Sequence, residues 1–566
     1  MKKTLLISFL FSSYISMAQN LDWAISNDAS IEIITNEITT DAIGNVYVTG
    51  IYSGTVDFDP GPNVENLTSV GSSGSGDIFI QKLDSSGSFL WAKSMGGAGS
   101  FFHFGWAITV DNEGGVYVTG AFEYIVDFDP GVGIFNLTSQ GGRDIFIVKL
   151  DSNGNFSWAN SMGSSALSEN GFSISSDVMN NIYVSGNFEN TVDFDPSNGV
   201  FNLTSLGGSD MFITKLDSAG NLIWAKSFES SANNYSWITV DCNQNDVIYL
   251  TGRFENSVDF DPGSGVSSLT SLGGTDIFIV KLDSAGNLLW VKSEGGLSSD
   301  HGQYINTDKL GNIYITGRFQ GTADFDPNTG TIYKNSNGSD DMFIQKLDQN
   351  GSLIWIKTIG GALSDWIGHA CIDTFGNVYL AGAFMDTVDF DPGISISNII
   401  SKGGRDIFIQ KLDSNGNFIW VNSFGSLDDD LGSIALDDNA NIYSTGTYRD
   451  TVDFDPNGGV FNLIQTGINV DSYILKLRQG VENNLSVNNA SFNNPFNIYP
   501  NPTSSYLNIN FNERIESVEI FNSSSKLIKK INPTLDIIDV SGFPTGIYFI
   551  KIVTNEMTIT KKFVKQ

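Results

Sequence analysis

The sequence predicts an all-β protein: a seven-bladed β-propeller with four strands per blade, closed by its N-terminal strand, followed by a small C-terminal β-sandwich. Two markers recur along most of the 566 residues. An Asp-Phe-Asp-Pro segment returns at intervals of 70, 66, 66, 65, 65 and 64 residues, and a Trp returns every 65 to 68 residues. The segment begins at Asp57, Asp127, Asp193, Asp259, Asp324, Asp389 and Asp453, and the Trp residues are Trp23, Trp91, Trp158, Trp224, Trp290, Trp355 and Trp420. Two independent markers with one period and seven copies each indicate a repeat array.

Each repeat is expected to contain four β-strands. In the second copy, residues 108–111, 116–122, 144–150 and 156–161 are rich in β-branched and aromatic residues and alternate every second position. That alternation is typical of half-buried strands. Asp-x-x-Gly segments such as Asp111–Gly114 separate the first strand from the second and the third from the fourth, and they predict tight hairpin turns capped by the Asp side chain.

The order of the markers predicts how the array closes. The chain begins with a lone Trp-containing strand at residues 21–26, and its last repeat strand, at residues 471–477, has no Trp-containing partner after it. We therefore expect the N-terminal strand to complete the last blade, which would remove the exposed edges of an open array.

The ends of the chain predict export. Lys2 and Lys3 precede an apolar run that ends in Ser16-Met17-Ala18, which predicts a signal peptide over residues 1–18. The propeller is expected over 19–480, a polar linker over 481–494 and the C-terminal domain over 495–566, with no later membrane span. The net charge of −33 argues against nucleic acid as a partner, and the two cysteines, Cys242 and Cys371, lie too far apart in the repeat order to predict a disulfide.

Two sets of motifs resemble known families. The segments Gly-Asn-Val-Tyr-Val-Thr-Gly (44–50), Gly-Asn-Ile-Tyr-Ile-Thr-Gly (311–317) and Asp-Ile-Phe-Ile-x-Lys-Leu-Asp (276–283 and 406–413) resemble the bacterial SBBP β-propeller repeats, over about residues 21 to 478. The segments at 496–503, 518–522, 539–551 and 561–565 resemble the type A C-terminal sorting domain of type IX secretion cargo in Bacteroidetes. The second resemblance implies contact with the type IX machinery and a protein that is released or held at the cell surface.

A candidate ligand site lies in the loops that enter the first strand of each repeat. This strand lines the channel of a propeller, so polar residues just before it are expected at the channel mouth, where aromatic residues accompany them. A glycan or a metal would fit such a ring, and capping of the loop explains the same residues equally well. The ring consists of His103, Glu169, Asn233, Asp300, Asp365 and Asp429.

A candidate cation site lies in the Asp-Phe-Asp-Pro segments. Two carboxylates two residues apart offer oxygens to Ca²⁺, although no copy continues as a complete calcium loop. The alternative is that the first Asp caps a turn while Phe and Pro pack between blades. The candidate ligands are Asp57, Asp59, Asp127, Asp129, Asp193, Asp195, Asp259, Asp261, Asp324, Asp326, Asp389, Asp391, Asp453 and Asp455, and calcium is the one cofactor that the pattern suggests.

These patterns favour a monomeric binding or scaffolding module for a glycan, protein or cation. The three His residues are scattered, and the sequence shows no Ser-His-Asp or Cys-His arrangement, so it assigns no catalytic residue. The alternative is a carboxylate-dependent hydrolase or lyase that acts on extracellular polysaccharide.

Overall fold

The computed structural model describes most of the chain. The described residues are 19–71, 75–99, 102–166, 168–197, 199–230, 237–242, 246–426, 430–479, 497–499, 503–510, 515–522, 526–531, 537–554 and 558–566. The predicted signal peptide, the linker, Asn233 and Asp429 lie outside them. The chain divides between Gly480 and Val481 into two compact units.

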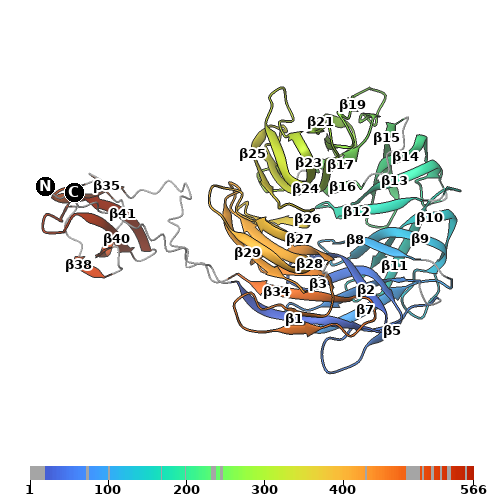
Figure 1. Ribbon diagram of the computed structural model, residues 1–566, viewed down its shortest axis with the longest axis horizontal. Helices are drawn as coiled ribbons and strands as arrows, with labels where there is room; N and C mark the ends of the chain where they lie inside the picture. The colour runs from blue at the N-terminus through green and yellow to red at the C-terminus, as the bar shows by residue number, and fades with distance from the viewer. Residues whose placement is uncertain are drawn as a thin grey trace. The chain divides into compact units, whose positions relative to one another are not determined.

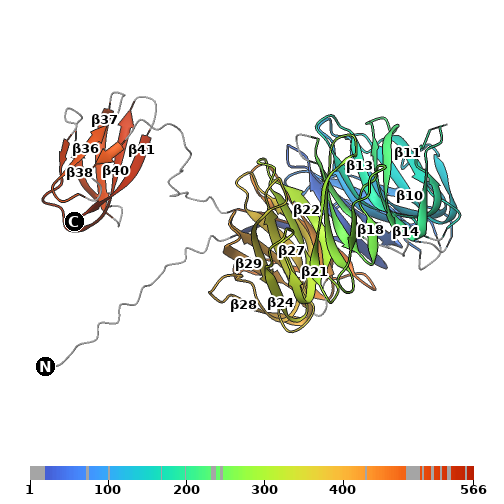
Figure 2. The same ribbon diagram turned by 90° about the horizontal axis from the view of Figure 1, so that it is seen from above.

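The first unit is an all-β, propeller-like array of antiparallel sheets around a common centre (Figure 1). Every regular element among the described residues is a strand, and they include no helix with the length and apolar character needed to cross a membrane. Figure 2 shows the sheets standing side by side. Neighbouring sheets therefore bury their faces against each other.

One set of four paired strands recurs along the first unit. The described strands form the sets β2(Glu32–Thr40), β3(Val46–Ser53), β6(Asp77–Leu83), β7(Phe89–Met95); β8(Phe104–Val110), β9(Val116–Asp127), β10(Asn136–Leu150), β11(Phe156–Met162); β12(Asn170–Ser176), β13(Ile182–Asp193), β14(Asn202–Leu216), β15(Leu222–Ser230); β16(Thr239–Cys242), β17(Ile248–Phe254), β20(Asp276–Leu282), β21(Leu288–Gly296); β22(His301–Thr307), β23(Ile313–Asp324), β24(Tyr333–Leu347), β25(Leu353–Ile359); β26(Trp366–Ile372), β27(Val378–Asp389), β28(Asn398–Leu412), β29(Phe418–Phe424); and β30(Asp430–Leu436), β31(Ile442–Tyr448), β34(Asp471–Arg478), β1(Asn20–Ala29).

The segment between the second and third strand of each set forms a further hairpin. In some sets it is a separate pair of short strands: β4(Thr55–Asp57) with β5(Asn66–Thr68), β18(Ser257–Asp259) with β19(Ser268–Thr270), and β32(Thr451–Asp453) with β33(Asn462–Ile464). In other sets the long second and third strands simply continue into it, as β9 and β10 do.

The N-terminal strand β1 pairs with β34, almost at the other end of the unit. Trp23 lies opposite Lys476 and Ile25 opposite Ile474 in the antiparallel register. The Asp22 carboxylate forms an ion pair with Arg478, whose Nε lies 2.8 Å from Asp22 Oδ2, and this pair adds charge complementarity to the strand pairing. The first and last repeat strands of the chain therefore share one sheet, as the order of the markers predicts.

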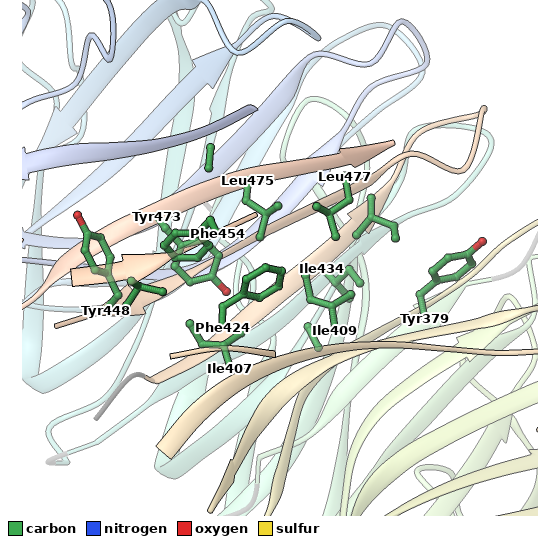
Figure 3. Packing of buried hydrophobic residues seen from close by; sticks show 14 of the residues in the cluster. Tyr379, Ile407, Ile409, Phe424, Ile434, Tyr448, Phe454, Tyr473, Leu475 and Leu477 are labelled. Atoms are coloured by element: carbon green, nitrogen blue, oxygen red, sulfur yellow. The ribbon is translucent and has the colours of Figure 1, made fainter. Parts of the chain in front are cut away.

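The hydrophobic core lies between neighbouring sets. In one such interface Ile407, Ile409 and Phe424 face Ile434, Leu475 and other buried side chains of the next set, among them Tyr448, Phe454, Tyr473 and Leu477 (Figure 3). The first strands also contact in series: β2 with β8, then β12, β16, β22, β26 and β30, and β30 again with β2. Packing between neighbouring sets buries the second and third strands along their length, as in β3 and β6.

In five of the seven sets, the recurring Trp ties the outer strand to the next set through its indole N–H, and the Trp290 and Trp420 N–H groups have no partner among the described residues. The Trp91 indole N–H donates to the Ser152 carbonyl at 3.2 Å, and its ring lies against Gly154 in the same turn. Gly154 has φ +77°, and a Cβ there would meet the Trp91 ring at 2.9 Å, so both backbone and space require glycine. Trp23 makes the same bond to Ser85 at 3.4 Å, which joins the set that contains β1 to the set that begins with β2.

The second unit is a small two-sheet structure. One sheet has the order β35(Asn497–Tyr499), β36(Tyr506–Asn510), β39(Ile537–Asp539), and the other has the order β38(Leu527–Ile531), β37(Ile515–Asn522), β40(Gly546–Thr554), β41(Thr558–Lys565). Leu507 and Ile538 from the first sheet share a buried core with Ile520, Ile550 and Phe563 from the second.

We expect Trp23→Ala to destabilise the whole first unit. Removing this half-buried indole should lower the free energy of unfolding by about 2–4 kcal/mol, because it deletes packing and one hydrogen bond between two sets. Urea unfolding followed by tryptophan fluorescence measures the loss. Trp158→Ala, the matched position in the middle of the chain, should cost about as much. A loss below about 0.5 kcal/mol at Trp23 with a large loss at Trp158 would show that β1 frays independently.

Candidate ligand-binding site

A central cavity of about 840 Å³ is enclosed by the first strands of the sets. Residues of β2, β8, β12, β16, β22, β26 and β30 all contribute to its wall. This volume is within the range of small-molecule sites in proteins. The cavity is therefore the candidate site of the first unit.

β-Bulges in the first strands decide which side chains face this cavity. Their pairing registers shift by one residue, for example between Gly105 and Ala107 and between Gly302 and Tyr304. The extra residue of a bulge leaves the ladder and turns its side chain to a new direction. Five residues at these shifts line the cavity: Asn36, Trp106, Phe172, Gln303 and Gly368.

Aromatic rings form one arc of the cavity wall. Trp106 stacks on Phe104 with ring centroids 4.6 Å apart and planes 2° apart. Trp237 lies edge-on to Trp106 at 5.5 Å and stacks on Phe172 at 4.4 Å. The rings come from β8, β12 and the residues before β16, so three consecutive sets contribute to this aromatic arc. We call Trp106, Phe172 and Trp237, which line the cavity, the aromatic arc, and Phe104 supports Trp106 by stacking on it.

Several polar atoms in the wall are buried without a hydrogen-bond partner among the described residues. They include the Trp106 indole N–H and the Gln303 side-chain oxygen. The hydroxyls of Thr35 and Thr239 also lack a partner, and these residues are 4% and 5% exposed. Buried polar groups normally have partners, so these atoms are exceptions to that rule among the residues of the cavity wall.

A buried polar cluster lies deeper in the cavity wall. The His369 Nδ1 lies 2.9 Å from the Ile434 carbonyl, and its Nε2 lies 3.7 Å from a Glu37 carboxyl oxygen. Cys371 Sγ lies 4.0 Å from His369 Nδ1, so the structure brings together a Cys-His pair that sequence inspection missed. His369 and Cys371 are two residues apart in β26, directly after its β-bulge, and Glu37 of β2 completes the group.

Burial keeps this cluster uncharged. It raises the pKa of Glu37 to about 8, lowers the pKa of His369 to about 4 and raises the pKa of Cys371 to about 12. A thiol with a raised pKa holds little thiolate at neutral pH and is a poor nucleophile. The geometry therefore favours a packed polar group over an activated cysteine.

The structure buries the described members of the predicted polar ring. The Asp300 carboxylate accepts the N–H groups of Gly296 at 2.7 Å and Gln320 at 3.1 Å. Asp365 binds the N–H groups of Gly361 and Met385 in the same way, at 2.8 and 3.1 Å. In these residues the carboxylate joins the loop before the first strand to the end of the second strand, which is the capping alternative considered above.

The two remaining described members occupy equivalent places. Glu169 accepts the Ser164 hydroxyl at 2.5 Å, and His103 Nδ1 accepts the Glu123 N–H at 3.4 Å. Burial raises the pKa of Asp300, Asp365 and Glu169 to about 7 and lowers the pKa of His103 to about 4. None of these four described residues is among those that line the cavity, and direct ligand contact by them stays a prediction.

The Asp-Phe-Asp-Pro segments lie where each extra hairpin meets the outer strand of the preceding set. Asp127, for example, bridges to Gly96 there. Its Oδ1 accepts the N–H of Asp129 at 3.1 Å and of Phe135 at 2.8 Å, while Asp129 Oδ1 accepts the Gly131 N–H at 2.8 Å. The other copies repeat this pattern of caps.

The Phe between the two carboxylates belongs to the core. Phe128 is fully buried and packs on Phe146 with centroids 5.0 Å apart. Among the described residues, no group of three or more His, Cys, Asp or Glu side chains is arranged to hold one metal ion. Calcium binding by the Asp pairs stays a prediction.

Sequence reasoning did not single out a further row of buried carboxylates. One Asp lies in the third strand of every set, as the first residue of β6, β20 and β34 and inside the longer third strands. Each side chain accepts a backbone N–H from the segment before it, as Asp77 does from Val70 at 2.6 Å. The signal was present as the first residue of the Asp-Ile-Phe-Ile motif. The row consists of Asp77, Asp144, Asp210, Asp276, Asp341, Asp406 and Asp471.

Comparison with protein families identifies the second unit. A family model described as a secretion system C-terminal sorting domain matches residues 497–566. The chain is therefore exported by type IX secretion to the cell surface or beyond, and the domain implies interaction with the type IX machinery.

Comparisons that extend over the first unit are distant. An uncharacterized WD repeat-containing protein of Acanthamoeba polyphaga mimivirus is 25% identical over 498 residues, which cover 73% of this chain and 35% of that protein. This chain thus spans about a third of that relative. A europium-containing methanol dehydrogenase matches at 11% identity and a TM-score of 0.35, covering 81% of this chain and 93% of that one. PorZ, a surface component of the type IX secretion system of Porphyromonas gingivalis, matches at 11% identity and a TM-score of 0.16, covering 96% and 100%.

We expect Asp300→Asn to flatten the dependence of stability on pH. The folded chain raises the pKa of Asp300 from 3.8 to about 7, so the folded state binds its proton more tightly. The free energy of unfolding of the natural protein therefore falls as pH rises from about 4 to about 7. The amide of the variant accepts with one oxygen only, so the variant should be less stable than the natural protein by about 1–3 kcal/mol at pH 5. Because residue 300 of the variant does not titrate, its stability should be closer to that of the natural protein at pH 8.

Urea unfolding at several pH values measures this difference. Glu65→Gln is the control, because the Glu65 side chain is exposed. An Asp300→Asn curve parallel to that of the natural protein would contradict the assigned burial.

For calcium, we expect chelation with EGTA to lower the Tm and added CaCl₂ to restore it. A ligand that binds the folded state at 100 times its Kd stabilises it by about 2.7 kcal/mol. Magnesium is the control, since Mg²⁺ prefers tighter octahedral geometry than these loops provide. A Tm that neither EGTA nor calcium changes would refute the calcium assignment.

Proposed function

We propose that this type IX-exported protein is a carbohydrate-binding surface module whose first unit is a closed seven-bladed β-propeller. The observation that carries the proposal is the aromatic arc in the central cavity. Flat aromatic faces pack against the apolar C–H faces of sugar rings, and polar side chains in the same wall, such as Asn36, Asn306 and Arg318, can bind sugar hydroxyls. The cavity wall offers both.

Closure of the ring supports a fixed cavity. The pairing of β1 with β34 and the series of contacts that returns from β30 to β2 both favour a closed ring. We assign the blades to SBBP-type repeats, as the motifs suggest, and we assign residues 1–18 to a cleaved signal peptide. A protein or cation ligand on the same face is an alternative outcome of the tests.

A hydrolase or lyase is the second candidate. Glu37 favours it, because a carboxyl that lines the cavity with its pKa raised to about 8 is protonated at neutral pH and suited to act as a general acid. Asp300 and Asp365 support this role less well, since backbone N–H groups occupy both oxygens of each and neither residue lines the cavity. In Glu37 the Ile108 N–H occupies Oε2 at 2.7 Å and leaves Oε1 for this role.

A glycan array probed with the full-length protein tests the proposal. We expect binding to defined oligosaccharides, and we expect Trp106→Ala or Trp237→Ala to weaken it by about tenfold or more, because each aromatic contact contributes on the order of 1–2 kcal/mol. Phe375→Ala is the matched control, since Phe375 is 78% exposed in an Asp-x-x-Gly turn outside the cavity.

Two other results would change the assignment. An array without any bound glycan, or arc variants that bind as the natural protein does while their Tm is unchanged, would refute carbohydrate binding in the cavity. Release of reducing sugar from a bound glycan, abolished by Glu37→Gln, would replace the binding module by the hydrolase.

A further inference from the structure

Arginine is concentrated at the central cavity. The chain has seven Arg residues, and four of them line the cavity: Arg253, Arg318, Arg405 and Arg449. The chain as a whole carries a charge of −33. Three acidic residues, Glu32, Glu37 and Asp241, line the same cavity, so basic residues outnumber acidic ones there, whereas the whole chain has 63 Asp and Glu against 30 Lys and Arg. Such a local excess of Arg attracts anions.

Two of these arginines occupy the same position in neighbouring sets. Arg253 follows Gly252 in β17, and Arg318 follows Gly317 in β23. The other sets have small, apolar or uncharged residues at this position. These residues are Ile51, Ala121, Asn187, Ala383 and Thr447. The fold therefore does not require Arg here, since five sets form the same strand without it.

The two guanidinium groups share one uncharged partner. Arg318 Nε donates to His301 Nδ1 at 3.2 Å, and Arg253 Nη1 lies 3.3 Å from each ring nitrogen of His301. Burial and the two arginines lower the pKa of His301 to about 3, so the imidazole is neutral. Within the described part of the chain, Arg318 forms no ion pair with a carboxylate. Because its partner ring is neutral, the Arg318 charge is stabilised by an anion that its guanidinium group can reach from the cavity wall.

The arginine pair adjoins the aromatic arc. A Cβ on Gly252, the residue before Arg253, would lie 2.7 Å from the Trp237 carbonyl, so the Trp237 backbone passes beside this turn of β17. Trp237, Arg253, His301 and Arg318 all line the one cavity. The aromatic arc and the arginine pair therefore belong to the wall of the same cavity.

We propose that the cavity binds an acidic sugar, with its ring on the aromatic arc and its carboxylate or sulfate group between Arg253 and Arg318. The inference rests on the proposed carbohydrate-binding function and adds the charge of the ligand. The planar guanidinium group donates two parallel N–H groups to a carboxylate or sulfate, which an ammonium group cannot do.

The test compares acidic and neutral sugars on the full-length protein by isothermal titration. The probes are oligogalacturonate, its methyl ester and a sulfated galactan oligosaccharide. We expect an acidic probe to bind at least about tenfold more tightly than the methyl ester, as charge-assisted hydrogen bonds add on the order of 1.5–3 kcal/mol. Preference for oligogalacturonate or for the sulfated galactan identifies the acidic group.

Arg318→Gln should remove that margin and leave binding of the methyl ester within about twofold. Arg318→Lys keeps the positive charge but lacks the two parallel N–H donors, so it should retain part of the preference for the acidic probe. It replaces Arg318→Gln as the test variant if Arg318→Gln lowers the Tm. Lys309→Gln is the matched control, because it removes one positive charge from an exposed turn that does not line the cavity.

The outcomes separate the two proposals. Equal binding of acidic and neutral sugars, or an acidic preference that Arg318→Gln leaves intact, would overturn the acidic-sugar inference and leave carbohydrate binding standing. Absence of binding to all sugars, acidic and neutral, would overturn both.

Discussion

The first unit depends on contacts between the outer strand of one set and a turn of the next set, which five of the seven sets make through a Trp indole N–H. A Trp indole covers a glycine whose backbone is left-handed, and its N–H is bound by a carbonyl of the same turn, as Trp91 does with Gly154 and Ser152. This contact fixes one sheet against the next at its outer edge, while the buried apolar faces fix it along its width. The first strands are then held at a constant spacing around the centre. The width of the central cavity is a consequence of that spacing.

The fold could be predicted from the sequence because its causes are repeated. The Trp, the Asp-Phe-Asp-Pro segment and the Asp-x-x-Gly turns each have a local structural task in every set, so seven copies in the sequence show the same requirement seven times. The pairing of β1 with β34 also followed, because the markers are out of phase by one strand at the two ends. Local rules suffice when the contacts repeat from one neighbour to the next.

The candidate site could not be predicted in the same way. The polar ring expected at the channel mouth was read from spacing alone, and spacing does not show where a side chain points. Asp300 and Asp365 turn inward because unpaired backbone N–H groups near them need acceptors. The bulges, in contrast, turn Trp106 and Gln303 into the cavity, and a bulge has no sequence signature here. His369 and Glu37 lie in β26 and β2, so only the ring brings them together.

Departures from the repeat indicate function more directly than the repeat does. A residue that recurs in all sets, such as the buried Asp in each third strand, is explained by the fold, because every set needs the same loop held to the same strand. Arg253 and Arg318 recur in two sets only, so the requirement they meet belongs to one side of the cavity. The same reasoning applies to Trp106 and Phe172, which replace smaller or polar residues at their bulges. An asymmetric wall on a symmetric frame is what recognition of an asymmetric ligand requires, and the frame leaves such positions free to vary because the Trp contacts between sets lie at the outer edge.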